Sequence, residues 1–383
     1  MASTGHDGDG GERRRGGEKR KREEESSKTG LEEMRKKRRG AEDGGLEDEE
    51  PRPGSSQDPV TSSPYPRLTI SRFNIHQILG RGNFGKVVLA SVPGRNIYMA
   101  VKIINKRDNE DTIMRERRIL QATRDCPFIC HLYAAHESLE RVYFIMEYLS
   151  GGSLNNLISM CGSLNIGNVR FYTAEMVCAL QFLHGHNIVH RDLKPQNIML
   201  DAEGHIRIID LGLAQDGVTS SNKIDGVTGT FYYMAPEVHL GKDYGTAVDW
   251  WSLGIVVSMM ATGRSPFYIG LSMQKSFKAI TKKEPKFPPG LHADLKHLIM
   301  KLLCKAPEMR LGVCGKIRKH PFFSIIGWEE LEERRAEPPC IPFQTVLQNK
   351  HLQWPADTTT LHPMLGFDYR SPSWERWRRR CGL

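Results

Sequence analysis

A stretch of charged residues near the middle of the chain carries the side chains that phosphoryl transfer requires. His190-Arg191-Asp192-Leu193-Lys194-Pro195-Gln196-Asn197 supplies a carboxylate, an ammonium and an amide, and Asp210-Leu211-Gly212 begins thirteen residues after Asn197. A base, a cation and two oxygen ligands for a metal ion would thus lie on two loops that flank one expected hairpin. Phosphoryl transfer needs such an arrangement, because the protein mainly positions groups and neutralises charge.

A glycine-rich segment farther upstream is suited to holding phosphate groups. Leu79-Gly80-Arg81-Gly82-Asn83-Phe84-Gly85-Lys86-Val87 lies between strands expected at 73–79 and 87–91. Glycines lack a Cβ, so backbone N–H groups can approach phosphate oxygens closely. Dinucleotide-binding folds also carry a Gly-x-Gly-x-x-Gly, but there the loop leads into a helix, whereas here it turns back into a strand. All nine residues are therefore candidate nucleotide-binding residues.

A lysine within the next apolar strand, expected at 98–104, is the third feature. Lys102 would be costly to bury without an anionic partner. A phosphate group and a glutamate of the helix expected at 111–121 are the obvious partners, and Glu116 is the natural candidate. A lysine that merely snorkels to the surface is the disfavoured alternative.

The elements that position these residues begin near residue 68. Residues 1–66 hold 14 Lys/Arg and 16 Asp/Glu, a balance of −2, so the rest of the chain carries 40 − 29 = +11 of the total charge of +9. Gly, Glu, Arg and Ser dominate residues 1–67, which predicts a disordered charged tail. From Leu68 onward, short β-like runs and then long helical ones follow.

Composition also narrows the cellular setting. The longest apolar run, Leu253 to Ala261, has nine residues, about half of the ~18 that a membrane helix needs, so no transmembrane segment is expected. Met1 to Gly10 has no apolar region typical of a secretory signal. We therefore expect a cytoplasmic or nuclear protein, or one found in both compartments.

The order and spacing of these motifs resemble a eukaryotic protein kinase over residues 73–323. The resemblance implies an α+β, bilobal kinase fold, with a small β-rich lobe at 73–145, a larger mainly helical lobe at 150–323 and ATP between them. Residues 324–383 would then be a C-terminal tail extension. Lys194 together with Thr230 is similar to serine/threonine kinases, which implies protein substrates that are phosphorylated on Ser or Thr.

The resemblance also assigns catalytic roles. Asp192 would accept the proton of the substrate hydroxyl, and Lys194 would stabilise the transferring phosphoryl group. Asn197 and Asp210 would hold Mg²⁺. Asp249 would anchor the catalytic loop from below, and Glu237 would pair with Arg310.

ATP would be bound by the remaining candidates. Gly80, Gly82 and Gly85 would cover its phosphates, and Lys102, paired with Glu116, would bridge the α- and β-phosphates. Met146-Glu147-Tyr148-Leu149 would form the hinge, whose backbone reads adenine, which adds Glu147 and Leu149 to the cofactor-binding set.

The C-terminal segment is similar to protein kinase C, especially the novel, delta-like enzymes, whose tail wraps over the small lobe. The similarity rests on Arg310-Leu311-Gly312, His320-Pro321-Phe322-Phe323 and residues 328–339. Gly366-Phe367-Asp368-Tyr369 is interpreted either as a remnant that reaches the nucleotide pocket or as part of a disordered tail. No cysteine-rich lipid-binding module or C2 domain is recognised before residue 67, so regulation by diacylglycerol or calcium is not implied.

Three departures from the family pattern bear on activity. Leu211 stands where the family has Phe and still fits an apolar slot. Gly226 replaces the activating threonine, so Arg191 loses its usual phosphate partner, and Asp225 is a candidate substitute with less charge and fewer acceptor atoms. We expect no phosphorylation at position 226 and a constitutive or weak activity. Stoichiometric phosphate on Thr228 of the active enzyme would contradict this expectation.

Substrate preference should also differ from that of basophilic relatives. These carry acidic residues at the positions of Ser153, Gln196 and Met259, none of which is acidic here. The folded part is itself basic, so we predict that the strong preference for arginine is lost.

Two basic clusters in the tail, Lys19-Arg20-Lys21-Arg22 and Arg35-Lys36-Lys37-Arg38-Arg39, are 12 residues apart, the spacing of a bipartite nuclear-import signal. A nuclear-import receptor is thus one candidate partner, and a solvated charged tail is the alternative. No nucleic-acid binding is expected, because an acidic block lies nearby and no aromatic residues are interleaved. We expect a monomer.

Two functions fit these features. An active serine/threonine kinase is favoured because the catalytic set is complete. A pseudokinase or scaffold that binds ATP but transfers phosphate poorly is the alternative, favoured only by Gly226 and the missing substrate acids.

Overall fold

The computed structural model describes residues 70–82, 85–107, 110–268, 270, 272–339, 352–356, 364, 367–374 and 376. The chain divides into two units, Met1–Pro66 and Arg67–Leu383, and every described residue belongs to the second. The predictions for the N-terminal tail, and those for Asn83 and Phe84, therefore lie outside the described residues.

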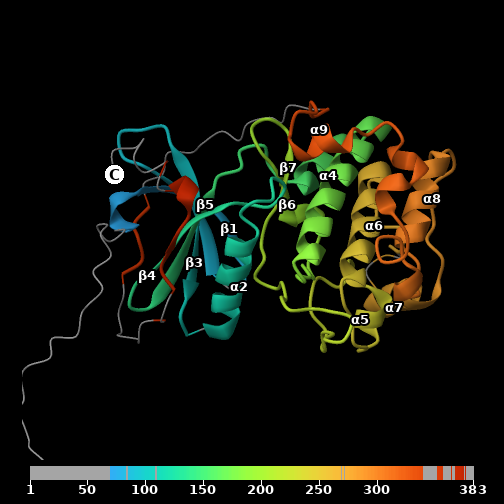
Figure 1. Cartoon of the computed structure of the whole chain (residues 1–383), viewed down its shortest axis with the longest axis horizontal. Coiled ribbons are helices and arrows are strands. Elements are labelled where there is room, and N and C mark those ends of the chain that lie inside the picture. The colour runs from blue at the N-terminus through green and yellow to red at the C-terminus, as the bar shows by residue number, and fades with distance from the viewer. Residues whose placement is uncertain are drawn as a thin grey trace, which may run out of the picture. The chain divides into compact units, whose positions relative to one another are not determined.

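A six-stranded sheet forms the small lobe, in the order β1-β2-β3-β5-β4-β8 (Figure 1). Its strands are β1 (Asn74–Gly82), β2 (Gly85–Ser91), β3 (Tyr98–Asn105), β4 (Leu132–Glu137), β5 (Arg141–Glu147) and β8 (Tyr369–Arg370). All of the pairings in this sheet are antiparallel. Helix α2 (Glu110–Ala122) accompanies the sheet and buries Ile113, Glu116, Ile119 and Leu120, which recur at helical spacing.

The sheet has an apolar cluster on each face, because successive side chains of a strand point in opposite directions. On β5, Val142 and Phe144 join the cluster that includes the buried residues of α2. Tyr143 and Ile145 join a second cluster with Phe73, Ile75, Val88, Val101 and Ile103, which we call the outer cluster. Both faces of this small sheet are therefore packed.

Helices form the larger lobe. They are α3 (Leu154–Cys161), α4 (Ile166–Gly185), α5 (Pro236–His239), α6 (Ala247–Thr262), α7 (Met273–Lys282), α8 (Ala293–Leu302) and α9 (Trp328–Glu332). The side chains of Ser153 and Asn165 cap the first turns of α3 and α4, as their residue types favour. Helix α6 ends at Gly263, whose φ of 72° is left-handed and unstrained only for glycine.

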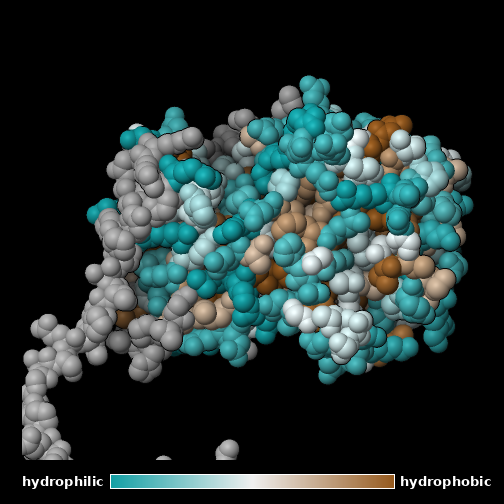
Figure 2. All heavy atoms as spheres, viewed as in Figure 1, coloured by the Kyte–Doolittle hydropathy of each residue, from teal (hydrophilic) through white to brown (hydrophobic). Residues whose placement is uncertain are grey.

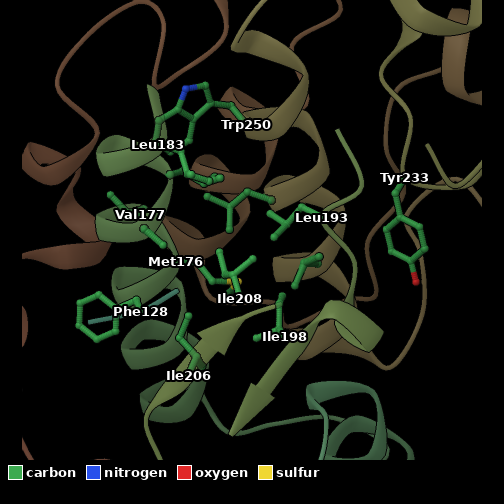
Figure 3. Close-up of a cluster of buried hydrophobic side chains, with 14 of the residues drawn as sticks. Phe128, Met176, Val177, Leu183, Leu193, Ile198, Ile206, Ile208, Tyr233 and Trp250 are labelled. Atoms are coloured by element: carbon green, nitrogen blue, oxygen red, sulfur yellow. The ribbon is translucent and has the colours of Figure 1, made fainter. Parts of the chain in front are cut away.

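The core of this lobe lies between α4, α6 and the two-stranded hairpin β6 (Ile198–Leu200) and β7 (Ile206–Ile208). Figure 3 shows Met176 and Val177 of α4, Ile206 and Ile208 of β7, and Leu193 converging there. Leu193 is fully buried although it lies between Asp192 and Lys194. Burial of Leu193 therefore helps to hold the loop that carries the catalytic candidates against this core.

The C-terminal tail docks on the small lobe. Tyr369–Arg370 pairs with Ala134 and Ala135 of β4, where the red segment lies beside that strand in Figure 1. Phe367 packs on Phe144 in the cluster that includes the buried apolar residues of α2. Trp374, in contrast, is fully buried in the outer cluster. The tail thus passes around the β4 edge and contributes to both faces of the sheet.

This position differs from both interpretations of Gly366-Phe367-Asp368-Tyr369. Gly366 lies outside the described residues. The other three lie against β4 rather than in the nucleotide pocket: Tyr369 pairs with Ala135 at the edge of the sheet, and Phe367 packs on Phe144. Asp368 accepts a hydrogen bond from the Glu137 backbone N–H and lies 3.5 Å from His136.

The expected α+β, bilobal fold is confirmed. The face shown in Figure 2 is mostly hydrophilic, with scattered hydrophobic residues. Among the residues that the structure describes, no helix has the length and apolarity required to cross a bilayer.

Candidate active site

Lys102 binds two carboxylates, one in the small lobe and one in the larger lobe. Its Nζ lies 2.6 Å from Glu116 Oε1 on α2 and 3.0 Å from Asp210 Oδ1, which follows the β6–β7 hairpin. Burial alone would lower the pKa of Lys102, but the two carboxylates outweigh it and raise that pKa above its ordinary value. Lys102 is therefore a permanent cation in this site, and the surface-lysine alternative is wrong, since the residue is 8% exposed.

Asp210 is held in its ionised form by the same contact. Burial would raise the pKa of this carboxyl group, but Lys102 outweighs that effect and lowers the pKa. Its φ of 60° is left-handed, a conformation that a non-glycine residue rarely adopts outside a constrained site. Strain and ion pairing thus aim the Asp210 carboxylate toward the small lobe.

A second group of contacts surrounds Asp192. Lys194 Nζ donates to Asp192 Oδ2 at 2.6 Å and to Thr230 Oγ1 at 2.9 Å, and Thr230 donates to Asp192 Oδ1 at 2.6 Å. Asn197 Nδ2 donates to the Asp192 carbonyl oxygen at 2.9 Å. The structure therefore brings Asp192, Lys194 and Asn197 together, as their spacing predicts, and places beside them Thr230, which the sequence resemblance groups with Lys194.

The catalytic loop is anchored from below by Asp249. This fully buried carboxylate of α6 accepts hydrogen bonds from the backbone N–H groups of His190 and Arg191, both at 2.9 Å. Burial would raise the pKa of Asp249, but the hydrogen bond with His184, at 2.9 Å, and the nearby charge of His184 and His190 together outweigh burial and lower that pKa. The anchoring predicted for Asp249 is therefore present, with His184 as a partner that the motifs did not reveal.

The glycine loop depends on one position above the others. Gly85 begins β2 with a φ of 136°, and a Cβ there would lie 2.0 Å from the Ile103 carbonyl oxygen of β3. A Cβ added at Gly80 or Gly82 would meet no heavy atom within 4 Å. Of these three glycines, only Gly85 is therefore required by the packing of the sheet itself.

The segment predicted to be the hinge begins at the end of β5. The Glu147 carboxylate accepts a hydrogen bond from the His131 N–H at 2.7 Å and lies 3.7 Å from Arg207 Nε. Its side chain is thus engaged within the protein, which leaves the backbone of this segment as the part suited to reading a base. Leu149, two residues later, is buried.

Asn197 and Asp210 suit a divalent cation of the magnesium type. Asn197 uses its amide nitrogen on Asp192, so its amide oxygen is the atom left to coordinate, and Asp210 uses Oδ1 on Lys102. Hard oxygen ligands of this kind, completed by substrate phosphates and water, are what Mg²⁺ prefers. No cluster of three or more His, Cys, Asp or Glu side chains with metal-site geometry occurs within the described ranges.

The segment that should face the substrate is fixed by a buried ion pair. Arg310, fully buried, donates to both carboxylate oxygens of Glu237, at 2.7 and 3.0 Å. Leu211 is buried, as expected for an apolar slot.

Asp225, however, accepts a hydrogen bond from the Gly226 N–H at 2.6 Å and forms no ion pair with Arg191. The substitution of a phosphate by Asp225 is therefore not seen.

Comparison with known proteins agrees with this geometry. A family model described as protein kinase domain matches residues 73–323. The chain is 39% identical over 281 residues to Protein kinase C delta type of Rattus norvegicus. The aligned region covers 72% of this chain and 42% of that protein. It is 38% identical over 294 residues to RAC-beta serine/threonine-protein kinase B of Xenopus laevis, covering 74% and 60%. The chain thus spans less than two thirds of the length of either relative.

Proposed function

The chain belongs to the protein kinase family, and we propose that it is an active enzyme that transfers the γ-phosphate of ATP to serine or threonine hydroxyls of proteins. The observation that carries the proposal is the hydrogen-bonded group of Asp192, Lys194 and Thr230 beside the Lys102–Asp210 ion pair. A chain that had lost catalysis would have no need of this complete set.

The residues divide the work by position and charge. Asp192 accepts the proton of the attacking hydroxyl, and its contact with Thr230 marks where a hydroxyl group sits on this carboxylate. Lys194 neutralises the charge that spreads over the transferring phosphoryl group. Lys102, fixed by Glu116, orients the other phosphates, so the chemistry depends on positioning rather than on a covalent intermediate.

Mg²⁺ is the cation that we propose for Asn197 and Asp210, where it would neutralise phosphate charge. Lys102 already occupies one oxygen of Asp210, so this carboxylate stays ionised with or without the cation.

The test is transfer of radiolabelled phosphate from Mg-ATP to a degenerate peptide library by the full chain and by Asp192→Asn. We expect measurable transfer, and a loss of at least about 100-fold in the variant, because removing a general base typically costs 10²–10⁴-fold. If both proteins are silent yet bind Mg-ATP, the chain is a scaffold.

Substrate selection should not depend strongly on arginine. Gln196 and Met259 have no carboxylate to offer a basic peptide. Both side chains are also engaged within the protein, since Gln196 donates a hydrogen bond to Asn155 and Met259 accepts one from Tyr233. A peptide array should therefore show no strong requirement for arginine two or three positions before the acceptor. An array that still demands arginine there would refute the proposal.

We also propose import into the nucleus through the two basic clusters of residues 19–22 and 35–39. Replacing Lys36, Lys37 and Arg38 by alanine should shift a fluorescently tagged chain toward the cytoplasm. An unchanged distribution ends the idea.

A further inference from the structure

A row of lysines runs along the exposed side of helix α7. Lys275, Lys278 and Lys282 are all exposed and recur at intervals of three and four residues, which places them within about 60° of one another around the helix axis. We call this row the lysine face. The helix buries a different side, made by Ser276, Ala279 and Ile280. The lysine face is therefore directed to solvent along about 10 Å of helix.

The lysine face has no counter-charge of its own. Residues 272–290 hold five lysines and a single acidic residue, Glu284. Within the described part of the chain, none of the three lysines of the lysine face forms an ion pair or a side-chain hydrogen bond. Like charges three and four positions apart on a helix repel each other, and α7 carries no carboxylate that would offset this repulsion. An anion bound across the lysine face would therefore relieve it.

The positive charge continues beyond the helix. Glu284 acts on Lys305, whose pKa it raises against the effect of burial. The backbone N–H of Lys286 donates to the Pro266 carbonyl oxygen at 3.2 Å, so the segment after α7 returns beside the loop that follows α6. Lys286 and Arg264, which lies in that loop, are both exposed. The lysine face is thus the centre of a wider basic surface.

Helix α7 packs against the segment that should face the substrate. Figure 1 shows α5 and α7 beside each other, and the ring of Phe277 on α7 lies 5.8 Å from the ring of His239 on α5. His239 Nε2 donates to the Phe231 carbonyl oxygen at 3.0 Å. Phe231 follows Thr230, whose hydroxyl donates to Asp192. Helix α7 therefore borders the segment along which a protein substrate would approach Asp192.

We propose that the lysine face docks an acidic segment of the protein substrate, a run of about four aspartate or glutamate residues. In extended form such a run spans roughly 13 Å, at about 3.3 Å per residue, which is enough to reach all three lysines. This charge preference agrees with Ser153, Gln196 and Met259, none of which offers a carboxylate to a basic peptide. The identification of a substrate as the carrier of the acidic run rests on the proposed kinase activity, whereas binding of the run does not.

Docking through exposed charges changes affinity rather than the chemical step. Among the described residues, the hydrogen bonds around Asp192 involve no residue of α7. An acidic run should therefore lower the KM for a peptide with little change in kcat. If each exposed charge pair contributes about twofold, three pairs give about eightfold tighter binding at low salt. The gain should disappear near 1 M salt, where the Debye length is about 3 Å.

The test measures binding by fluorescence anisotropy with the full chain. Each labelled peptide carries one serine and a run of four glutamates at a chosen distance from it, and the matched peptide carries four glutamines instead. We expect at least one glutamate peptide to bind about eightfold more tightly than its match. The triple variant Lys275→Gln/Lys278→Gln/Lys282→Gln should remove that gain. The control Lys296→Gln/Lys301→Gln/Lys316→Gln removes the same charge at exposed lysines outside α7 and should keep it.

A charge swap separates docking from a loss of folding. Replacing the three lysines of the lysine face by glutamate should make a peptide with four lysines the tighter ligand, which an unfolded variant would not do. Vesicles of phosphatidylserine and phosphatidylcholine are a second probe, because anionic lipid offers the same charge.

Three results would overturn the proposal. They are equal binding of the glutamate and glutamine peptides, equal loss of the gain in the two glutamine triple variants, and a response to the α7 triple variant with vesicles alone. Because anisotropy requires no transfer, a chain that binds the acidic peptide but transfers no phosphate would refute the proposed function and leave the docking site intact.

Discussion

Arg310 and Glu237 form an ion pair in which both ends of the guanidinium fork meet the carboxylate. Arg310 also donates to the carbonyl oxygens of Ala247 and Cys304, so each of the three nitrogen atoms of this fully buried guanidinium donates at least one hydrogen bond. Removing one partner of such a pair is strongly destabilising, because the remaining charge stays buried without a counter-charge.

Glu237→Ala should therefore lower the free energy of unfolding by about 3–5 kcal/mol, the usual cost of leaving one buried charge unpaired. Urea denaturation monitored by tryptophan fluorescence measures the change. The double variant Glu237→Leu/Arg310→Met is the control, since it removes both charges and should recover much of the stability. A single variant as stable as wild type would show that the pair contributes nothing.

Lys305, unlike Arg310, packs on aromatic rings rather than on a carboxylate. Its Nζ lies 4.6 Å from the ring centre of Trp251 and 4.1 Å from that of Phe267, and it has no hydrogen-bond partner among the described residues. Burial, with a contribution from Arg310, lowers its pKa from 10.5 to about 8, although Glu284 opposes the shift and the rings favour the charged form.

This shift predicts a pH dependence of stability. Above pH 10.5 the lysine is neutral in both states and costs nothing, whereas below about pH 8 the folded chain bears the full cost of the charge. Stability should thus rise with pH across that window, and Lys305→Met should remove this part of the rise and stabilise the protein at neutral pH. Denaturation measured from below pH 8 to above pH 10.5, with Lys296→Met as the exposed control, tests this prediction. Parallel stability curves for wild type and Lys305→Met would contradict it.

At the scale of elements, the β1–β2 turn and the C-terminal tail are both sensitive to single changes. The turn brings backbone of β2 so close to β3 that no Cβ fits at Gly85. The tail contributes a fully buried tryptophan to a lobe from which it is distant in sequence.

Gly85→Ala should lower stability by more than about 1 kcal/mol and weaken ATP binding, because a positive φ and a clash with the Ile103 carbonyl oxygen must both be relieved. Gly80→Ala is the matched control, since it meets no atom within 4 Å and should leave the free energy of unfolding nearly unchanged. Thermal unfolding and nucleotide titration of the two variants decide the matter. Equal stability in both would mean that the β2–β3 pairing relaxes freely.

Trp374→Ala should cost about 3–5 kcal/mol, as for other large buried aromatic residues. The side chain packs edge-on against Phe73 with ring centres 6.5 Å apart, so its loss opens the outer cluster. Arg376→Ala, an exposed change two residues later, is the control. The melting temperature measures both, and an unshifted value for Trp374→Ala would mean that the tail does not dock.

At the scale of the whole molecule, the sequence predicted what local patterns encode. The strand at 98–104 and the helix at 111–121 are present as β3 and α2 within one residue at each end, because an apolar run and a helical period are local signals. Lys102 and Glu116 could be paired from the sequence because a buried cation needs an anion.

Contacts between distant segments could not be predicted in this way. Nothing near Asp249 points to His184, 65 residues away, and nothing near Trp374 marks it as core of the small lobe. The use of Asp225 by its own neighbour Gly226 is likewise a matter of loop geometry that residue types do not reveal. The partners of a site were therefore predictable where charge demanded them and not where packing supplied them.

The docking of the tail has a consequence for synthesis on the ribosome. Trp354 donates its indole N–H to the Phe73 carbonyl oxygen, and these two residues are 281 positions apart in the chain. At about 5–20 residues per second, the strands that emerge first wait roughly 15–60 s for the residues that complete their outer cluster. The small lobe, although it is translated first, therefore receives the last residues of its outer cluster only when the tail has been made.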